Sequence, residues 1–284
     1  MADPADPALT DRPGHLTPAA LRWIRRVLAP LVRVLHRPTL TGLEHLPTDG
    51  PFMLVANHSA GLGLSEIGCL LALYAEAFGD SRPLAGFAHP LGMRIFPASV
   101  LMRHVGAVPS TYAAAEATLA AGVPLLVFPG GDHETMRPLW QAGRVDFGGR
   151  RGFLRIARKM GVPVVPLGIR GSHLTAPILW RSRHILPWLL VLPRLVGLKR
   201  WALTLLGVAV AAAVLVLAPW DPLWRVLAAW AVLTSPLIFL PYMPTTITLR
   251  IGPPLAPEAL FDAADPDLSA ALARVEAAVQ SLVA

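Results

Sequence analysis

The stretch Phe52-Met-Leu-Val-Ala-Asn57-His58-Ser59-Ala-Gly61 joins an apolar run to an abrupt polar turn. A short apolar run bounded by proline and small residues is typical of a strand that is buried on both faces of a parallel sheet. Apolar residues then recur at roughly helical spacing from Leu64 to Phe78, which predicts a strand, a loop and a helix. Because open α/β sheets bind ligands at the carboxyl ends of their strands, His58 is expected beside a substrate. A histidine that only stabilises a turn is the alternative.

Strands and helices are predicted to alternate through most of the chain. Further strands are expected at residues 84–89, 106–109, 124–128, 163–169 and 245–251, and helices at 111–121, 148–161 and 257–284. This alternation predicts an α/β domain whose mixed, largely parallel sheet is flanked by helices. The domain would comprise residues 39–200 and 245–284, with a hydrophobic helical hairpin of residues 201–244 inserted between the two parts.

The composition indicates a protein that associates with a membrane. Hydrophobic residues make up 54% of the 284 residues and charged residues only 15%, against about 25% charged residues in ordinary soluble domains. The formal charge of +7 fits either nucleic acid or the anionic face of a membrane. Nucleic-acid binding needs a solvated basic face with exposed aromatic residues, whereas here arginines alternate with long aliphatic runs. A membrane surface is therefore the expected partner, and no nucleic acid is expected.

The N-terminal part is predicted to contain a mobile tail and a basic helix. Residues 1–18 are rich in proline and polar residues, which favours disorder, and residues 1–14 lack the apolar segment of a signal peptide. Cys69 is the single cysteine, so no intrachain disulfide can form. Residues 19–38 have the pattern of a basic amphipathic helix that fits a membrane interface. A helix packed on its own domain is almost as good an interpretation.

Residues 201–244 are expected to enter the membrane as a hairpin. The run 202–219 contains 18 uncharged residues, which reach about 27 Å as a helix against a hydrocarbon thickness of about 30 Å. Because the chain returns to the sheet afterwards, two crossings are expected rather than one. Basic residues precede the first run, which places the α/β domain on the cytoplasmic face of the cell inner membrane. A hairpin lying in one leaflet and a pair of buried helices are the alternatives.

Three polar loops follow three predicted strands and are expected at one edge of the sheet. They are Asn57-His58-Ser59, Pro129-Gly130-Gly131-Asp132-His133-Glu134 and Gly168-Ile-Arg170-Gly171-Ser172-His173. A histidine near neutrality takes a proton from a hydroxyl when a carboxylate holds the imidazole in the right tautomer. Gly130 and Gly131 let backbone N–H groups turn toward an oxyanion or a phosphate. The loops thus predict a site for acid–base chemistry.

Four short motifs occur in a fixed order along the chain. They are Asn57-His58 after the first strand, Gly106-Ala-Val-Pro109, Phe128-Pro-Gly-Gly-Asp-His-Glu134 and Val162-Pro-Val-Val-Pro166. In this order and spacing they resemble the glycerolipid acyltransferase superfamily, and most of all the branch similar to monoacylglycerol and diacylglycerol acyltransferases. The resemblance covers residues 40–173 and resumes at 245–255. It implies transfer of a fatty acyl group from acyl-CoA or acyl carrier protein, as co-substrate, to a hydroxyl of a membrane lipid, with no further cofactor.

The resemblance also implies roles for residues of the loops. His58 would be the general base that deprotonates the acceptor hydroxyl, without a covalent acyl-enzyme. Contacts to the substrate would come from Asn57, Ser59, Gly130 and Gly131. Arginines are candidates for binding the phosphates of CoA or an acidic headgroup, namely Arg103, Arg137, Arg150 and Arg151. No His-x-x-x-His or Cys-x-x-Cys spacing predicts a metal site.

The sequence leaves open which carboxylate assists His58. Related phosphate-type acyltransferases carry an acid five residues after the histidine, where this chain has Gly63. Glu66, Glu134 and Asp132 are the candidates, with Glu134 or Glu66 favoured. In the alternative interpretation, Glu66 only stabilises the start of its helix, where the helix dipole favours a carboxylate. The glycine also weakens the case for lysophosphatidate as the acceptor.

Two other functions fit parts of the same sequence. The segment 57–61 differs by one residue from the Gly-x-Ser-x-Gly nucleophile elbow, so a serine lipase or esterase using Ser59, Asp132 and His173 can be drawn. Asn57 counts against it because the strained elbow needs glycine. A catalytically inactive membrane scaffold is the second alternative, and Gly63 is its main support. Both alternatives predict that a His58→Ala variant behaves as the parent protein does.

Overall fold

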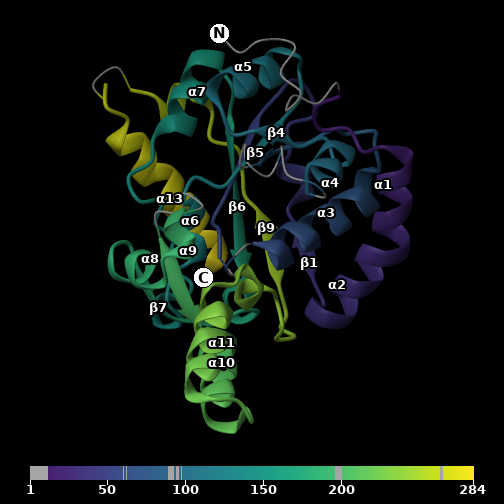
Figure 1. Cartoon of the computed structure of the whole chain (residues 1–284). Helices are drawn as coiled ribbons and strands as arrows, with labels where there is room; N and C mark the ends of the chain where they lie inside the picture. The colour runs from purple at the N-terminus through teal and green to yellow at the C-terminus, as the bar shows by residue number, and fades with distance from the viewer. Residues whose placement is uncertain are drawn as a thin grey trace.

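A seven-stranded mixed sheet lies at the centre of the computed structural model, which describes residues 12–59, 61, 63–88, 93, 96, 98–195, 200–262 and 265–284 (Figure 1). Its strand order is β1-β9-β6-β2-β5-β3-β4. The strands from β6 to β4 run parallel, β9 pairs antiparallel with β6, and β1 pairs parallel with β9. The prediction of a mixed, largely parallel sheet is therefore confirmed. The strands are β1 Thr39–Thr41, β2 Met53–Ala56, β3 Ala85–Ala88, β4 Val108–Pro109, β5 Leu125–Val127, β6 Val164–Arg170 and β9 Thr248–Ile251.

Helices cover both faces of this sheet (Figure 1). On β2, Met53 and Val55 belong to one hydrophobic core, whereas Leu54 and Ala56 belong to the other. All of its residues are apolar because both faces of the strand are buried. Each of the larger side chains contributes about 1.5–3 kcal/mol by leaving water. One core is closed by α5 Tyr112–Ala120, α7 Gly152–Met160 and α13 Ser269–Val283, and the other by α1 Pro18–Trp23, α2 Ala29–His36 and α3 Leu64–Phe78.

The N-terminal segment is packed on the domain. A π-helical stretch, Ile24–Leu28, joins α1 to α2, and Ile24 and Val32 are buried in the core that contains α3. The opposite side exposes an apolar stripe of Trp23, Val27, Leu31 and Val34. The packing interpretation therefore holds for one face of this helix, and a membrane role for the other face stays a prediction.

Part of the expected tail is ordered. The N–H of Gly14 donates to the carbonyl of Gly106 at 2.8 Å, and the side chain of Leu16 is buried. The prediction of a mobile tail is wrong for these residues because Leu16 finds a place in the core and Asp80 accepts its backbone N–H at 2.8 Å. Residues 1–11, the rest of that prediction, lie outside the described part of the chain.

The inserted segment contains a helical hairpin that projects from the body of the molecule (Figure 1). Its helices are α10 Leu205–Leu217 and α11 Pro222–Thr234, with 13 residues each, so each is about 20 Å long. Across the described residues, no helix is long and apolar enough to cross a membrane. The predicted pair of crossings is therefore not supported. The first apolar run is shortened because its start, β8 Trp201–Thr204, pairs with β7 Ile178–Ser182.

The hairpin helices are not buried either. Val216 is 72% exposed, Leu217 76% and Leu223 65%. The base of the insertion is anchored by a separate hydrophobic cluster that includes Trp201, Ile238 and Phe239. Two short helices, α8 Ile185–Leu190 and α9 Leu192–Leu195, lie between β7 and β8. The placement of this hairpin in one leaflet stays a prediction.

Candidate active site

The carboxyl ends of three neighbouring strands bring the predicted loops together. β2 lies between β5 and β6, with Val55 opposite both Val127 and Pro166. The loop that carries His58 therefore lies between the glycine-rich loop after β5 and the loop after β6. The expected convergence at one edge of the sheet holds.

His58 is paired with a buried carboxylate from the first turn of α3. Nδ1 of His58 contacts Oε1 of Glu66. The Glu66 side chain is completely buried, whereas 12% of the His58 side chain stays exposed. Glu66 also accepts the backbone N–H of Ser59 at 2.9 Å, so the same carboxylate holds both the ring and its loop. This arrangement favours the tautomer with its proton on Nδ1 and a lone pair on Nε2.

Gly63 makes this pairing possible. It precedes α3 with a φ of +69°, a conformation that glycine adopts without strain. A Cβ atom at this position would overlap the His58 ring and lie 3.0 Å from both of its nitrogens. An acid five residues after the histidine has no room here. Glu66, three residues further on, reaches the imidazole from inside the helix.

Glu134 holds the backbone of the His58 loop rather than the imidazole. It lies in α6 Gly131–Thr135 and is buried. Its carboxylate accepts the N–H of His58 at 2.9 Å, the N–H of Asp146 at 3.0 Å and a guanidinium N–H of Arg137 at 3.2 Å. Burial raises the pKa of Glu134 to about 7, against the opposing effect of these hydrogen bonds and of the Arg137 charge.

Asn57 and Ser59 are also engaged with the protein. The Asn57 amide donates to the carbonyl of Ile169 at 2.8 Å and accepts its N–H at 2.7 Å, which joins the end of β2 to β6. The Ser59 hydroxyl lies 2.9 Å from the hydroxyl of Ser172, which is completely buried. Both side chains, expected at the substrate, therefore fix the position of the His58 loop.

The two glycines of the loop after β5 have different reasons to be glycine. A Cβ atom on Gly130 would overlap the Glu134 side chain, so Gly130 makes room for that carboxylate. Gly131 has a φ of +43°, and its N–H donates to the carbonyl of Phe128 at 3.2 Å. That amide is therefore already used inside the loop, contrary to the expectation that it would face an oxyanion or a phosphate.

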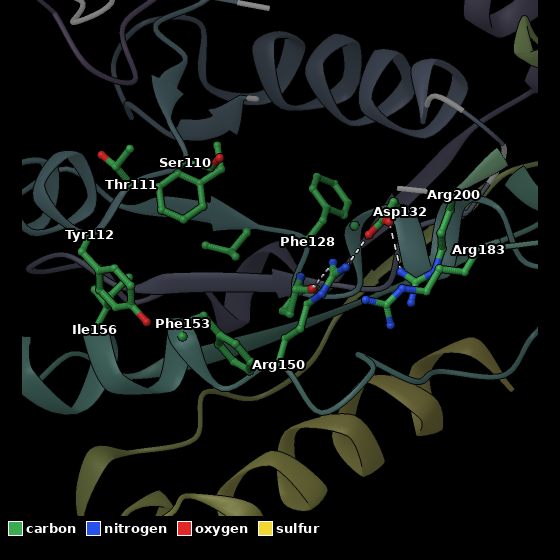
Figure 2. A pocket seen from close by; sticks show the side chains of 15 residues that line it. Ser110, Thr111, Tyr112, Phe128, Asp132, Arg150, Phe153, Ile156, Arg183 and Arg200 are labelled. Carbon is green, nitrogen blue, oxygen red and sulfur yellow. Dashed lines mark hydrogen bonds and ion pairs between the residues drawn. The ribbon is translucent and has the colours of Figure 1, made fainter. Parts of the chain in front are cut away.

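A cavity of about 750 Å³ lies next to this loop (Figure 2). Phe128 lines it and stacks on the His58 imidazole, with ring centroids 4.4 Å apart. Asp132 lies at one end, where its carboxylate pairs with Arg150 and, at 3.0 Å, with Arg200. Burial alone would raise the pKa of Asp132, but these two guanidinium groups hold it below the ordinary value. Asp132 is thus separated by its partners from any role beside the imidazole.

The predicted arginines divide between the site and the surface. Arg150 lines the cavity and donates to the carbonyl of Gly130 at 2.7 Å, and Arg137 supports Glu134. Arg151 instead pairs with Asp267 at 2.8 Å. Arg103 is exposed in the last turn of α4 Ala98–His104 and is not among the residues that line the cavity.

Several residues of the site were not predicted. Phe128 was predicted as a strand end and as the first residue of the glycine-rich motif, but its stacking on the His58 ring was not predicted. Arg183 and Arg200 are among the basic residues that precede the first apolar run, from which only the membrane orientation was predicted. The β7–β8 ribbon that carries them to the cavity was not predicted. Ser172 was noted only as part of a loop.

The contacts do not assemble a lipase triad from the described residues. Ser59 is bonded to Glu66 and Ser172, and Asp132 pairs with arginines. His173 lines a second cavity with Arg170 and Arg250. Cys69 is buried, which raises the pKa of its thiol to about 12 and argues against a thiolate nucleophile.

The chain is similar to known proteins in sequence and in fold. The family model described as Acyltransferase matches residues 37–170. An uncharacterised protein of Mycobacterium tuberculosis is 28% identical over 187 residues, which are 63% of this chain and 49% of that protein. Phytyl ester synthase 2 of Arabidopsis thaliana, a chloroplastic protein, is 27% identical over 137 residues, which are 46% of this chain and 19% of the plant protein. The chain thus spans about half the length, or less, of these curated relatives.

A solved structure shares the fold. The crystal structure of the 1-acyl-sn-glycerophosphate acyltransferase PlsC from Thermotoga maritima superposes with a TM-score of 0.52 and 20% sequence identity, covering 93% of this chain and 80% of that one. At this identity the likeness supports the fold alone. The family match covers His58, Glu66 and Glu134. Residues 37–170 are therefore similar to an acyltransferase domain.

Proposed function

We propose that this protein is an O-acyltransferase that moves a fatty acyl group from acyl-CoA or acyl carrier protein to a hydroxyl of a glycerolipid or related lipid. The observation that carries the proposal is the pairing of the His58 imidazole with the buried Glu66 carboxylate at the carboxyl edge of the sheet. A general base of this type needs a neutral imidazole held in one tautomer. Because Glu66 faces Nδ1, Nε2 is the atom that receives the proton of the acceptor hydroxyl.

His58 acts twice in the proposed reaction. Nε2 takes the hydroxyl proton while the hydroxyl oxygen attacks the thioester carbonyl carbon, and the carbonyl electron pair moves onto its oxygen. When the carbonyl re-forms, the C–S bond breaks and the leaving thiolate takes the proton from Nε2. The products are the ester and the free thiol, and the imidazole is neutral again. Glu66 stabilises the transient imidazolium because its carboxylate lies against Nδ1.

The remaining contacts support this role by positioning. Glu134 and Asn57 fix the backbone on either side of the imidazole through the N–H of His58 and the strand β6. Phe128 lies against one face of the ring. A base held from several sides loses little entropy when the reactants meet, which is the main advantage of a preorganised site.

We test this proposal with His58→Ala in the purified full chain, offered labelled acyl-CoA and a panel of lipid alcohols. Loss of product with unchanged folding supports it. The matched control is His104→Ala, because His104 is exposed at the end of α4 and outside the site. A lipase would keep activity in His58→Ala and lose it in Ser59→Ala, and an inactive scaffold would form no product in any variant.

We also propose that the acceptor is reached from the cytoplasmic face of the cell inner membrane, where the hairpin of α10 and α11 lies in one leaflet. The helices contain a single charged residue, Arg225. Leu215, Val216 and Leu217 are consecutive and all exposed, so the apolar surface surrounds the end of α10 instead of forming one stripe. Lipid covers such a surface from all sides, whereas a flat protein partner does not.

The length of the helices supports a shallow position. About 20 Å is enough to enter one leaflet, whose hydrocarbon is about 15 Å thick, and too short for a bilayer of about 30 Å. Trp220 and Trp224 are exposed at the turn and at the start of α11. The amphipathic helix α1–α2 adds a second exposed apolar stripe, with Arg22 and Arg26 beside it.

Flotation with vesicles of anionic phospholipid tests the membrane proposal. We expect the parent protein to float and the double variant Val216→Asp, Leu223→Asp to remain in the dense fraction. Trp140→Asp is the matched control, because Trp140 is 69% exposed but lies outside the hairpin. Equal flotation of all three proteins contradicts the proposal.

A further inference from the structure

The first turn of α3, which carries Glu66, begins without a side-chain cap. Its N-cap residue is Gly63, which has no side chain that could accept a backbone N–H. The first N–H groups of a helix lack partners inside the helix, and a serine, threonine, aspartate or asparagine usually binds one of them. Because the His58 ring occupies the space beside Gly63, such a residue has no room there. The turn that directs Glu66 at the imidazole is therefore held by other contacts.

Thr175 supplies one of these contacts from the segment after β6. It is completely buried, and its hydroxyl lies 3.1 Å from the hydroxyl of Ser65, the second residue of α3. The Thr175 hydroxyl donates to the carbonyl of Ser172 at 2.7 Å. Because a hydroxyl has a single proton to donate, the Ser65 hydroxyl is the donor in its bond to Thr175. This bond ties the residue next to Glu66 to the interior of the domain.

A second branch of the same hydroxyl network leads from Ser172 to Glu66. The Ser172 hydroxyl lies 2.9 Å from that of Ser59, and the Ser59 hydroxyl donates to the Glu66 carboxylate over a long distance of 3.5 Å. Since Ser59 uses its proton on the carboxylate, Ser172 is the donor to Ser59. Ser65, Ser172 and Thr175 are all buried. A buried network in which each hydroxyl proton is bonded holds its members in one arrangement.

The backbone of Thr175 is fixed by the base of the inserted hairpin. Its carbonyl accepts the N–H of Tyr242 at 3.0 Å and the N–H of Met243 at 3.1 Å. The Tyr242 hydroxyl in turn accepts the N–H of Leu206, in the first turn of α10, at 3.2 Å. Thr175 therefore joins the first turn of α3 to the base of the insertion.

We propose that Thr175 is a positioning residue, which directs the Glu66 carboxylate at His58 by holding the first turn of α3 through Ser65. The inference rests on the proposed acyl transfer, in which Glu66 stabilises the imidazolium of His58. The Thr175 hydroxyl bonds to Ser65 and Ser172, so it acts through them and not on the imidazole itself. Thr175 is also not among the residues that line the cavity beside the His58 loop. Loss of its hydroxyl is therefore expected to slow the reaction without weakening substrate binding.

Two substitutions at this position separate the hydroxyl from the shape of the side chain. Thr175→Val removes the hydroxyl and keeps the shape, whereas Thr175→Ser keeps the hydroxyl. In the purified full chain with labelled acyl-CoA and lipid alcohols, we expect Thr175→Val to lower the turnover number about tenfold, the rate equivalent of one hydrogen bond, with KM unchanged. Thr175→Ser should retain most of the parent turnover number. Thr118→Val is the matched control, because Thr118 is buried on α5 and its hydroxyl donates to the carbonyl of Ala114 at 2.7 Å.

Proton NMR of the same proteins gives a readout that needs no turnover. An imidazole N–H that donates to a buried carboxylate gives a signal at low field because the hydrogen bond is short and charge-assisted, and His58→Ala identifies the signal of His58 by removing it. We expect the signal in the parent and in Thr175→Ser, and its loss or displacement in Thr175→Val. Ser65→Ala breaks the same hydrogen bond from the side of α3 and should act as Thr175→Val does. Where Thr175→Val does not fold, Ser65→Ala carries the test.

The two readouts also distinguish this inference from the proposed function. A parent-like signal in Thr175→Val, or its absence from the parent protein, overturns the inference. So does an equal effect of Thr118→Val or Thr175→Ser, which would assign the change to general destabilisation. An unchanged turnover number of Thr175→Val in an active protein overturns it as well. If the parent protein forms no ester at all, the proposed function fails, and the NMR signal still decides whether Thr175 holds Glu66 against His58.

Discussion

Gly63 lies so close to the His58 imidazole that no side chain fits between them. A Cβ atom on Gly63 would overlap Cε1 of the ring, and the φ of +69° is a conformation that favours glycine. The glycine and the carboxylate of Glu66 therefore form one arrangement, in which the helix α3 supplies the acid from inside its first turn. Under the proposed function, the carboxylate at position 66 takes the place of the acid that the resemblance predicts at position 63.

Gly63→Asp should inactivate the protein even though it restores an acid five residues after the histidine. The aspartate would displace the imidazole and adopt a backbone conformation that costs about 1–2 kcal/mol. We expect the turnover number to fall at least about tenfold. Activity of the double variant Gly63→Asp, Glu66→Ala equal to that of the parent would contradict the assignment of Glu66.

Glu66→Gln and Asp132→Asn should differ sharply in their turnover numbers. Glu66→Gln removes the charge that stabilises the imidazolium, so we expect the turnover number to fall about 100-fold or more. Asp132→Asn removes partly exposed ion pairs, which are worth about 0–1 kcal/mol each, and should leave the turnover number within a few fold. Steady-state kinetics of both variants check this prediction. The reverse order would make Asp132 the partner of the base.

Asn57→Ala should lower the free energy of unfolding. It leaves the buried N–H and carbonyl of Ile169 without their partners, at a cost of about 2–4 kcal/mol in the free energy of unfolding. His58→Ala, at a partly exposed side chain, should cost much less. Denaturant titration of the two variants measures the difference. An Asn57→Ala protein as stable as its parent would indicate that the Asn57 amide is free to bind the substrate.

The sequence predicted the elements whose pattern is local. The helix expected from Leu64 to Phe78 has these bounds in the structure, and the strand before His58 runs from Met53 to Ala56. Both follow from the continuous apolar strand and the helical spacing after it. The ribbon β7–β8 was missed because Trp201–Thr204 continues directly into the apolar helix α10, so nothing in the local pattern separates the two.

The details of the site depend on contacts between distant residues. Three carboxylates were candidates for the partner of His58, and only the helical phase of α3 decides that Glu66 points at the ring. Glu134 meets the backbone of His58 across 76 residues of chain. Arg183 and Arg200 reach the cavity because the β7–β8 ribbon folds back on it, which no motif records.

The pKa of Glu134 makes stability depend on pH in a defined direction. Burial raises this pKa from 4.5 to about 7, so the folded protein binds the proton more tightly than the unfolded chain. The resulting stabilisation is fully present below pH 4.5 and is lost as the pH rises to 7. Its size is on the order of 3 kcal/mol. Glu134→Gln should lack this dependence, as unfolding titrations at acidic and alkaline pH would show. Parallel curves for the two proteins would contradict the raised pKa.

The most direct test of the account is the single-turnover rate of thiol release from an acyl thioester in the presence of a lipid alcohol. The account predicts that His58→Ala reduces this rate by about 100-fold or more, with the fold and the binding of the thioester unchanged. A His58→Ala protein that releases thiol and forms ester within twofold of the parent rate would contradict the claim that His58, held by Glu66, is the general base.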